Sequence, residues 1–304
     1  MTPPELHPDV IARLTPHKSS VYSVHFSPSE NVFFSGSSDG LVYQWNIGNY
    51  TEAKLVAKIS GTILSLCYIP ESSLLLIGQL QGGLHVLDLK IKQEIKHLVI
   101  NQKGIFDIKI RDSKILLAGG EGVLSVLDLK SFDLISKIKL SEKSIRKIDF
   151  SDNEIAVGTS DNSISILDAG TFSIKNKLNS HKNSVFSVKY SQDGNFLLSG
   201  SRDAHLCVWN AKDQYNLLHS IPAHNYTIND IAFNESGTLF ATASRDKSIK
   251  LWNTADFSFL KKLASTAGGH LNSVNSIFWN GSKLFSCSDD RSLIVWDVQS
   301  QEIL

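Results

Sequence analysis

The chain has few of the residues that mark disulfide-linked or metal-binding proteins. Its three cysteines are odd in number, show no Cys-X-X-Cys spacing and lie in stretches of alternating apolar and polar residues. We therefore expect Cys67, Cys207 and Cys287 to be small buried side chains, with no disulfide framework. The histidines and acids show no spacing typical of a ligand set, so no metal and no cofactor are expected.

Charge of one sign is not in excess, because 30 basic residues balance 30 acidic ones. Proteins that wrap nucleic acid usually carry a basic surplus, so nucleic acid is not the expected partner. No apolar run reaches 18 residues, and the first ten residues lack the pattern of a signal peptide. We therefore expect a soluble, cytoplasmic protein with no membrane partner.

The chain does contain one short pattern that recurs. Two apolar runs joined by a tight polar turn predict a β-hairpin, and each clear copy ends in Trp followed by Asp or Asn. Weaker copies, with Leu in place of Trp, fill the gap between the first clear copy and the second. The seven anchor positions, 40 to 44 residues apart, are 45, 87, 127, 167, 209, 252 and 296.

Seven near-equal units of about 40–45 residues predict a β-propeller. We expect an all-β fold, a single seven-bladed propeller with four antiparallel strands per blade, in one domain spanning residues 1–304. Residues 10–14 stand before His17 as residues 217–221 stand before His224. The N-terminal strand is therefore predicted to complete the last blade and close the ring, which removes exposed sheet edges.

Residues at fixed distances from the anchors make the chain resemble the WD-repeat propeller family over essentially its whole length. An acid lies six residues before the anchor in six units, and a histidine lies 26 or 28 residues before it in four. In WD-repeat proteins the Trp, a strand hydroxyl, the His and the turn Asp form a hydrogen-bonded set. The resemblance implies four such sets, in units one, five, six and seven: Trp45, Ser35, His17 and Asp39; Trp209, Ser199, His181 and Asp203; Trp252, Thr242, His224 and Asp246; Trp296, Ser286, His270 and Asp290.

We interpret each set as a structural brace, because buried indole and imidazole groups need partners. A Ser-His-Asp hydrolase triad is the competing interpretation, but a nucleophile has no reason to recur in four units. Units two to four have Leu for Trp and lack the His, so apolar packing is expected to replace the brace there. That side of the ring would then be less rigid, or free to bind a partner.

The resemblance also implies where partners dock, on the narrow face around the central channel. The positions exposed there are the third residue of each unit's first strand and the residue before each turn acid. Arginines from units four, five and six would suit an acidic or phosphorylated peptide, unless they pair with nearby acids. The candidate partner-binding residues are Tyr22, Leu64, Phe106, Arg146, Phe186, Arg202, Asn229, Arg245, Asn275 and Asp289.

The expected function is that of a non-catalytic scaffold that binds proteins or peptides, as a monomer or within a hetero-complex. One alternative is an RNA- or ribosome-associated propeller, although the turns on the opposite face look acidic or neutral. The other is an enzyme with a site in the central channel. An enzyme would need carboxylates or histidines on several innermost strands, which carry mostly Ser, Val and Ile.

Overall fold

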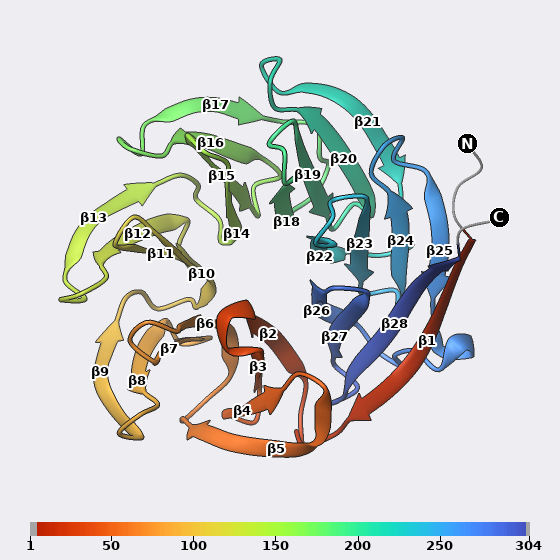
Figure 1. The fold of residues 1–304 in the computed structure, drawn as a ribbon. Helices are drawn as coiled ribbons and strands as arrows, with labels where there is room; N and C mark the ends of the chain where they lie inside the picture. Colours follow the sequence, from red (N-terminus) through yellow and green to blue (C-terminus); the bar gives the residue numbers. More distant parts are fainter. Residues whose placement is uncertain (1–4, 302–304) are drawn as a thin grey trace.

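Twenty-eight β-strands form seven four-stranded antiparallel sheets within residues 5–301, the part of the chain that the computed structural model describes. The sheets stand around a central axis like the blades of a propeller (Figure 1). The predicted all-β, seven-bladed fold is confirmed. Residues 1–4 and 302–304, which the expected domain includes, lie outside the described residues.

Each blade contributes one strand to each of four concentric layers. From blade one to blade seven, the innermost strands are β2 (Val21–Ser27), β6 (Ile63–Ile69), β10 (Ile105–Arg111), β14 (Ile145–Phe150), β18 (Val185–Tyr190), β22 (Ile228–Phe233) and β26 (Val274–Asn280). In the same order, the second strands are β3 (Val32–Ser37), β7 (Leu74–Gln79), β11 (Lys114–Gly119), β15 (Glu154–Thr159), β19 (Phe196–Ser201), β23 (Leu239–Ser244) and β27 (Lys283–Ser288).

The third strands carry the anchor residues at or near their ends: β4 (Leu41–Asn46), β8 (Gly83–Asp88), β12 (Val123–Asp128), β16 (Ile164–Asp168), β20 (His205–Asn210), β24 (Ile249–Asn253) and β28 (Leu293–Gln301). The outermost strands are β5 (Asn49–Lys58), β9 (Gln93–Val99), β13 (Leu134–Lys139), β17 (Ile174–Leu178), β21 (Asn216–Pro222), β25 (Phe259–Leu263) and β1 (Glu5–Leu14). Two single-turn 3-10 helices, η1 (Pro28–Glu30) and η2 (Ser265–Ala267), lie in connections, and no helix in the described part of the chain is long and apolar enough to cross a membrane.

The ring closes between the two ends of the chain. Strand β1 pairs antiparallel with β28, from Glu5 opposite Gln301 to Leu14 opposite Leu293. The two strands lie side by side in the same blade (Figure 1). The strand expected at residues 10–14 is therefore confirmed, and it begins five residues earlier than the sequence pattern indicated.

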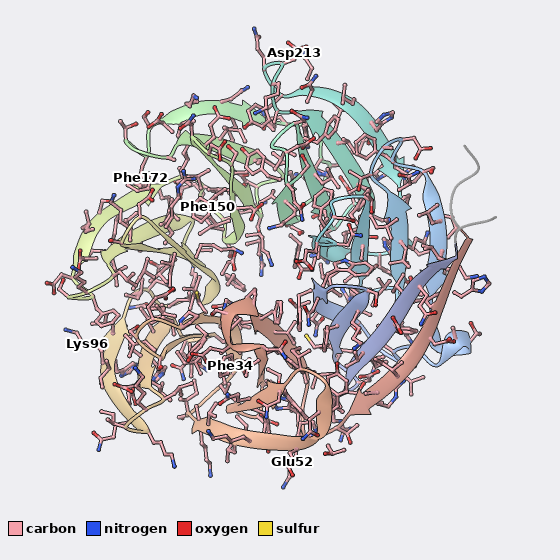
Figure 2. The ribbon with its side chains drawn as sticks, viewed as in Figure 1. Phe34, Glu52, Lys96, Phe150, Phe172 and Asp213 are labelled. Carbon is pink, nitrogen blue, oxygen red and sulfur yellow. The ribbon has the colours of Figure 1, made fainter. Side chains whose placement is uncertain are left out.

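The second strands are almost wholly buried, because both of their faces pack against neighbouring blades. Phe33 of blade one stacks on Trp45 at 5.8 Å between ring centroids and lies 5.2 Å from Phe285 of blade seven. Phe34 also lies inside, whereas charged side chains such as Glu52 project from the outer rim (Figure 2). The sequence alternation thus yields one apolar layer between each pair of blades.

A glycine in the second strand lets the next blade approach closely. A Cβ atom on Gly36 would lie 2.7 Å from Ile63 of blade two, and one on Gly200 would lie 2.5 Å from Ile228 of blade six. Both distances are shorter than van der Waals contact. The Ser-Gly-Ser stretches of the repeat are therefore packing positions, in addition to turn signals.

The three cysteines are free and buried, as expected. Burial raises the pKa of the Cys67 thiol to about 12 and raises that of Cys287 further. The thiols of Cys67 and Cys287 therefore stay protonated at neutral pH, and all three cysteines pack as small buried groups.

Candidate binding site at the channel mouth

The four predicted braces are all present. In blade five, the Trp209 indole N–H donates to Ser199 Oγ at 2.9 Å, and His181 contacts Ser199 at 2.8 Å and Asp203 at 3.0 Å. The corresponding bonds in blades one, six and seven measure 2.7 to 3.3 Å. Because every member has a partner and the serine is fully buried, the set fixes the loop before each blade against its turn.

Blade four departs from the expectation that apolar packing alone replaces the brace. Its turn acid, Asp161, accepts hydrogen bonds from Ser163 Oγ at 2.5 Å and from Thr159, and pairs with Lys177 at 3.3 Å. Hydrogen bonds and the lysine thereby hold the pKa of Asp161 well below its usual value, although burial opposes this. A network of hydroxyls takes the place of the histidine in this blade.

Seven of the candidate residues, one from near the start of each innermost strand, lie together in the structure. They line one cavity of about 570 Å³ in the central channel, which extends along the innermost strands of blades one to three. Equivalent positions of a ring face its axis, which explains why residues chosen by their place in the repeat line the same cavity. These residues are Tyr22, Leu64, Phe106, Arg146, Phe186, Asn229 and Asn275.

The three other candidates stand one step outside that cavity. The backbone N–H groups of Arg202, Arg245 and Asp289 bond to carbonyls just before the innermost strands of their blades, at 2.9 to 3.0 Å. This places them at the same end of the channel, around its mouth. Arg202 and Arg245 are exposed.

The centre of the site is a guanidinium held between two aromatic rings. Arg146 lies 4.2 Å from the ring centroid of Phe106 and 4.8 Å from that of Phe186, which come from the blades on either side. Its Nε–H donates to Ser160 Oγ at 2.8 Å. Burial, helped by the charge of Arg202, lowers the pKa of Arg146 below its ordinary value. Two cation–π contacts therefore fix this side chain in place.

None of the three mouth arginines is neutralised by an acid. Among residues 5–301, the arginines with a carboxylate within 4.0 Å are Arg13 and Arg111. The alternative that Arg146, Arg202 and Arg245 pair with neighbouring acids is therefore not what the structure shows. The three arginines therefore bring positive charge to the mouth, beside aromatic rings, without forming ion pairs with described residues.

The two candidate asparagines and Asp289 clamp the ring instead of facing outward. The Asn229 amide donates to Val274 O at 2.8 Å, across the junction of blades six and seven. The Asn275 amide donates to Val21 O at 2.9 Å, across the junction of blades seven and one, and to Asp289 of its own blade at 2.8 Å. The amide donors of both asparagines are therefore already bonded, and the donors of the mouth that remain free are those of the arginines.

Below the mouth, the channel holds charges that the sequence interpretation overlooked. Three carboxylates on innermost strands each accept a backbone N–H from the following blade, at 2.8 to 3.1 Å. Two of them also pair with a lysine, at 2.9 and 3.0 Å. For Asp107, Lys147 and Asp230, the available signal was a charged residue at the position where the other units have Ser. The carboxylates are Asp107, Asp149 and Asp230, and the lysines are Lys147 and Lys189.

These carboxylates change the electrostatics of the channel. Burial disfavours a charged Lys147, but Asp230 and Asp107 outweigh it and raise the lysine's pKa. Deeper in the cavity, burial and the nearby Lys109 lower the pKa of His25 to about 4. At neutral pH the channel thus contains a charged Lys147 and a neutral His25 imidazole. The Asp–Lys pairs join blades to one another.

Seven four-stranded blades, a ring closed by both chain ends and four Trp–hydroxyl–His–Asp braces define a WD-repeat β-propeller. A WD domain, G-beta repeat model matches residues 8–46. The model of the nucleolar protein 10-like, N-terminal domain matches residues 46–296, most of the chain. The chain therefore belongs to the nucleolar protein 10-like N-terminal domain family.

Individual relatives resemble a smaller part of the chain. The WD repeat and FYVE domain-containing protein 2 of Caenorhabditis briggsae and that of Caenorhabditis elegans are each 29% identical to it over 87 residues. That stretch is 28% of this chain and 21% of each relative. The chain thus matches about a fifth of the length of these relatives, which supports the repeat assignment and no more.

Proposed function

We propose that this propeller is a non-catalytic scaffold whose channel mouth binds an acidic or phosphorylated segment of a partner protein. The observation that carries the proposal is Arg146, held between Phe106 and Phe186 with no carboxylate beside it. Its Nε is bonded within the protein, while its terminal N–H groups make no hydrogen bond to any described residue. A rigid guanidinium with free donors is preorganised for a carboxylate or phosphate.

The neighbouring residues support the same ligand. Arg202 and Arg245 add exposed positive charge on the next two blades, and Tyr22, Leu64 and Phe186 add apolar surface. Aromatic residues and arginines are the types that dominate binding energy at protein interfaces. A peptide with an acidic group flanked by an apolar side chain would match this arrangement.

A non-catalytic role fits the placement of the reactive groups. The hydroxyl of each Ser–His–Asp set is buried inside a blade and bonded to an indole, so it has no access to a substrate. The channel carboxylates are engaged by backbone N–H groups and lysines. These arrangements favour binding over catalysis as the function of the ring.

The test compares wild-type protein with a Phe186→Ala/Arg202→Ala variant and an Arg291→Ala control, which removes an exposed arginine from a turn of blade seven. Binding of matched acidic, phosphorylated and neutral peptides is measured by fluorescence polarisation. We expect at least a tenfold loss of affinity for the acidic peptides in the double variant, about 1.4 kcal/mol, with an unchanged melting temperature. Equal binding by all three proteins would refute the site.

The family match favours a second candidate, a propeller that works within an RNA–protein assembly. Since the family is described as nucleolar protein 10-like, we propose the nucleolus as the cellular location, in place of the cytoplasm expected from the sequence. The balanced charge of the chain argues for protein contacts over direct RNA contacts. A fluorescent fusion tests the location. RNA binding that weakens steeply between 50 and 200 mM salt would favour the RNA-binding alternative.

A further inference from the structure

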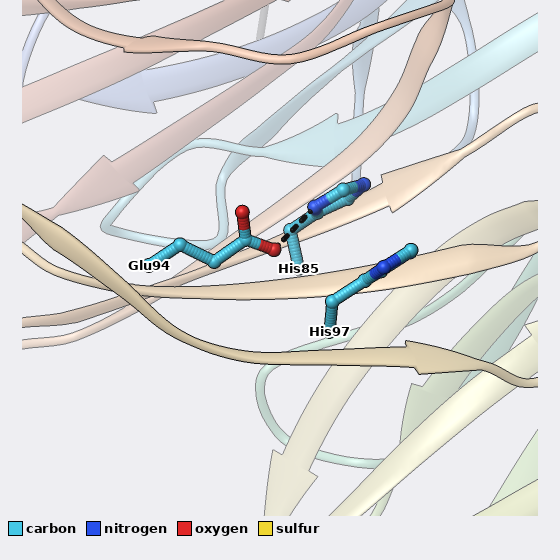
Figure 3. A group of neighbouring side chains, drawn as sticks. All are labelled: His85, Glu94 and His97. Atoms are coloured by element: carbon cyan, nitrogen blue, oxygen red, sulfur yellow. Dashed lines mark hydrogen bonds and ion pairs between the residues drawn. The ribbon is translucent and has the colours of Figure 1, made fainter.

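Blade two carries a cluster of nitrogen and oxygen donors that lies outside the channel. His85 on β8 and His97 on β9 are directly opposite each other in the strand pairing, and Glu94 lies nearby on β9. Figure 3 shows the two imidazole rings stacked, with Glu94 reaching His85 from the side. One donor atom from each of the three lies within 4.8 Å of the others. The spacing of these residues in the sequence does not indicate a cluster, because they are brought together by the pairing of two strands.

His85 is the fixed member of the cluster. Its side chain is buried, and its Nδ1 lies 2.7 Å from Glu94 Oε1. An ion on Nε2 would lie on the far side of the ring from Glu94, so an ion that binds both residues must replace the hydrogen between Nδ1 and the carboxylate. That Nε2 is buried and makes no hydrogen bond with the described residues. The fold therefore presents Nδ1 and the Glu94 carboxylate, not Nε2, as the adjacent donor atoms of this cluster.

His97 is the adjustable member. Its ring centroid lies 4.3 Å from that of His85, with only 10° between the ring planes. The in-plane lone pairs of stacked rings run parallel, so His97 must turn about its side-chain bonds before both rings can bind one ion. His97 is exposed. Turning it therefore disturbs no packed side chain.

Gly83 leaves the space that this movement needs. A Cβ atom at position 83 would lie 3.0 Å from His97 Nε2 and 2.6 Å from the side-chain oxygen of Gln79. Any other residue at this position would crowd the His97 ring. The glycine stands two residues before His85 on the same strand.

We propose that His85, Glu94 and His97 form a binding site for a transition-metal ion of the Zn²⁺ type. Two imidazole nitrogens and one carboxylate oxygen are a ligand set that zinc uses in proteins, at about 2.0–2.2 Å, with water in the remaining position. Ligands of a tetrahedral ion at these distances are roughly 3.4 Å apart. The widest separation, up to 4.8 Å, must therefore shrink by up to about 1.4 Å, and movement of the exposed His97 and Glu94 can provide this.

The donor set also selects against the common hard cations. Mg²⁺ and Ca²⁺ prefer shells made of oxygen, whereas imidazole suits Zn²⁺, Cu²⁺ and Ni²⁺. The site is distinct from the channel mouth, since it lies on the third and outermost strands of blade two. The scaffold proposal and this one can therefore fail independently.

The test uses the tag-free chain, freed of metal with a chelator and titrated with Zn²⁺ by isothermal calorimetry, with the bound metal counted by mass spectrometry. The variants are His97→Gln and Glu94→Gln, both at exposed positions. The control is His219→Gln, which removes an exposed histidine from β21, the outermost strand of blade five. Circular dichroism checks that all variants keep the wild-type fold.

We expect one Zn²⁺ per wild-type chain, at least tenfold weaker binding in His97→Gln and Glu94→Gln, and no change in His219→Gln. Loss of a supporting residue around a metal typically weakens binding 10–100-fold, and loss of a ligand weakens it at least as much. Mg²⁺ at the same concentration should not compete. A wild-type chain that takes up no Zn²⁺, or a His97→Gln variant that binds it equally well, would overturn the proposal.

Discussion

Lys147 of blade four pairs with Asp230 of blade six at 3.0 Å, although blade five separates the two blades in the ring. The same carboxylate accepts hydrogen bonds from Ser276 Oγ at 2.9 Å and the Ile277 N–H at 3.1 Å, both in blade seven. One buried side chain thus connects three blades through the channel. The connection supplements the apolar contacts between neighbouring blades.

Replacing Lys147 with Met should therefore destabilise the ring. The change leaves the buried Asp230 carboxylate without its lysine partner. We expect a loss of about 3 kcal/mol in the free energy of unfolding, the lower end of the range for breaking a buried ion pair, because Lys147 keeps some solvent contact. Urea denaturation measures the loss.

A comparison with Lys189→Met separates this effect from the general loss of a lysine. Lys189 pairs with Asp149 at 2.9 Å, but it joins adjacent blades and its side chain is 36% exposed. Its replacement should cost about 1 kcal/mol or less, as for partly exposed pairs. Equal losses in the two variants would contradict the role assigned to the pair across the channel.

The brace predicts a large effect from removing one oxygen atom. Ser199→Ala leaves the Trp209 indole N–H and His181 Nε2 without a partner in a buried site. At about 1–3 kcal/mol for each unsatisfied group, the variant should lose about 2–6 kcal/mol. Thermal and urea unfolding provide the measurement.

Ser187→Ala is the matched control for the brace. Ser187 lies in the same blade and is fully buried, but its hydroxyl makes no hydrogen bond within the described part of the chain. Its removal should be neutral or stabilising, because an unpaired buried hydroxyl costs free energy in the folded state. A loss as large as that of Ser199→Ala would mean that burial of a serine, and not the brace, sets the cost.

The pKa shifts of the histidine and the acid in the brace of blade six indicate how the stability of the protein should fall in acid. Burial lowers the pKa of His224, and hydrogen bonds from His224 and Ser248 lower the pKa of Asp246 against the effect of burial. Both folded-state values lie below the unfolded ones, so the unfolded chain binds more protons in acid. Stability should therefore be full above about pH 6.5 and fall as the pH drops through the imidazole and then the carboxyl range.

Asp246→Asn tests this pH dependence, because it removes the carboxylate that contributes at the acid end. The variant should be less stable at pH 7 and lose less further stability between pH 5 and pH 3 than the wild type. Asp213→Asn, at an exposed loop position (Figure 2), serves as the control. Parallel pH profiles for Asp246→Asn and the wild type would exclude the carboxylate as a cause.

Strand β1 predicts that truncation of the N-terminus opens the ring. A chain that begins at residue 17 lacks the partner of β28 and the buried side chains of Leu6 and Leu14. The two leucines alone contribute about 3–6 kcal/mol, and the bare edge of β28 invites aggregation. Calorimetry and light scattering measure both effects.

A synthetic peptide of residues 5–16 should restore the melting temperature of the truncated chain. A scrambled peptide of the same composition should leave the truncated chain unchanged. Full stability of the truncated chain without any peptide would show that β1 is dispensable.

The sequence predicted the features that depend on position within a repeat. The members of each brace stand at fixed distances in the chain, as in the set Trp209, Ser199, His181 and Asp203. One copy of the brace therefore predicted the other three. Phe106, Arg146 and Phe186 occupy equivalent positions of successive units and therefore had to meet at the channel. Their contact follows from the symmetry of the ring, but the insertion of the guanidinium between the rings depends on side-chain rotamers, which repeat spacing does not specify.

The features missed by the sequence interpretation depend on contacts between units or across strands. Asp230 reaches Lys147 two blades away, a relationship that repeat spacing does not encode. His85 and His97 meet because β8 and β9 are paired in one register, and a register shift of one residue would separate them. In blade four, Asp161 uses hydroxyl partners because no histidine is present. Hydroxyl groups thus replace the missing histidine in this blade. A comparison of repeats shows that the histidine is absent but does not show what takes its place.

The pairing of β1 with β28 also sets an order for folding on the ribosome. Strand β1 is synthesised before its partner β28, with nearly the whole ring between them in the chain. At about 5–20 residues per second, β1 waits on the order of 15–60 s for β28 to emerge. During that interval the nascent chain exposes an unpaired strand with apolar residues, which is the kind of segment that chaperones bind. The last blade can therefore be completed only after β28 has emerged, however early β1 is made.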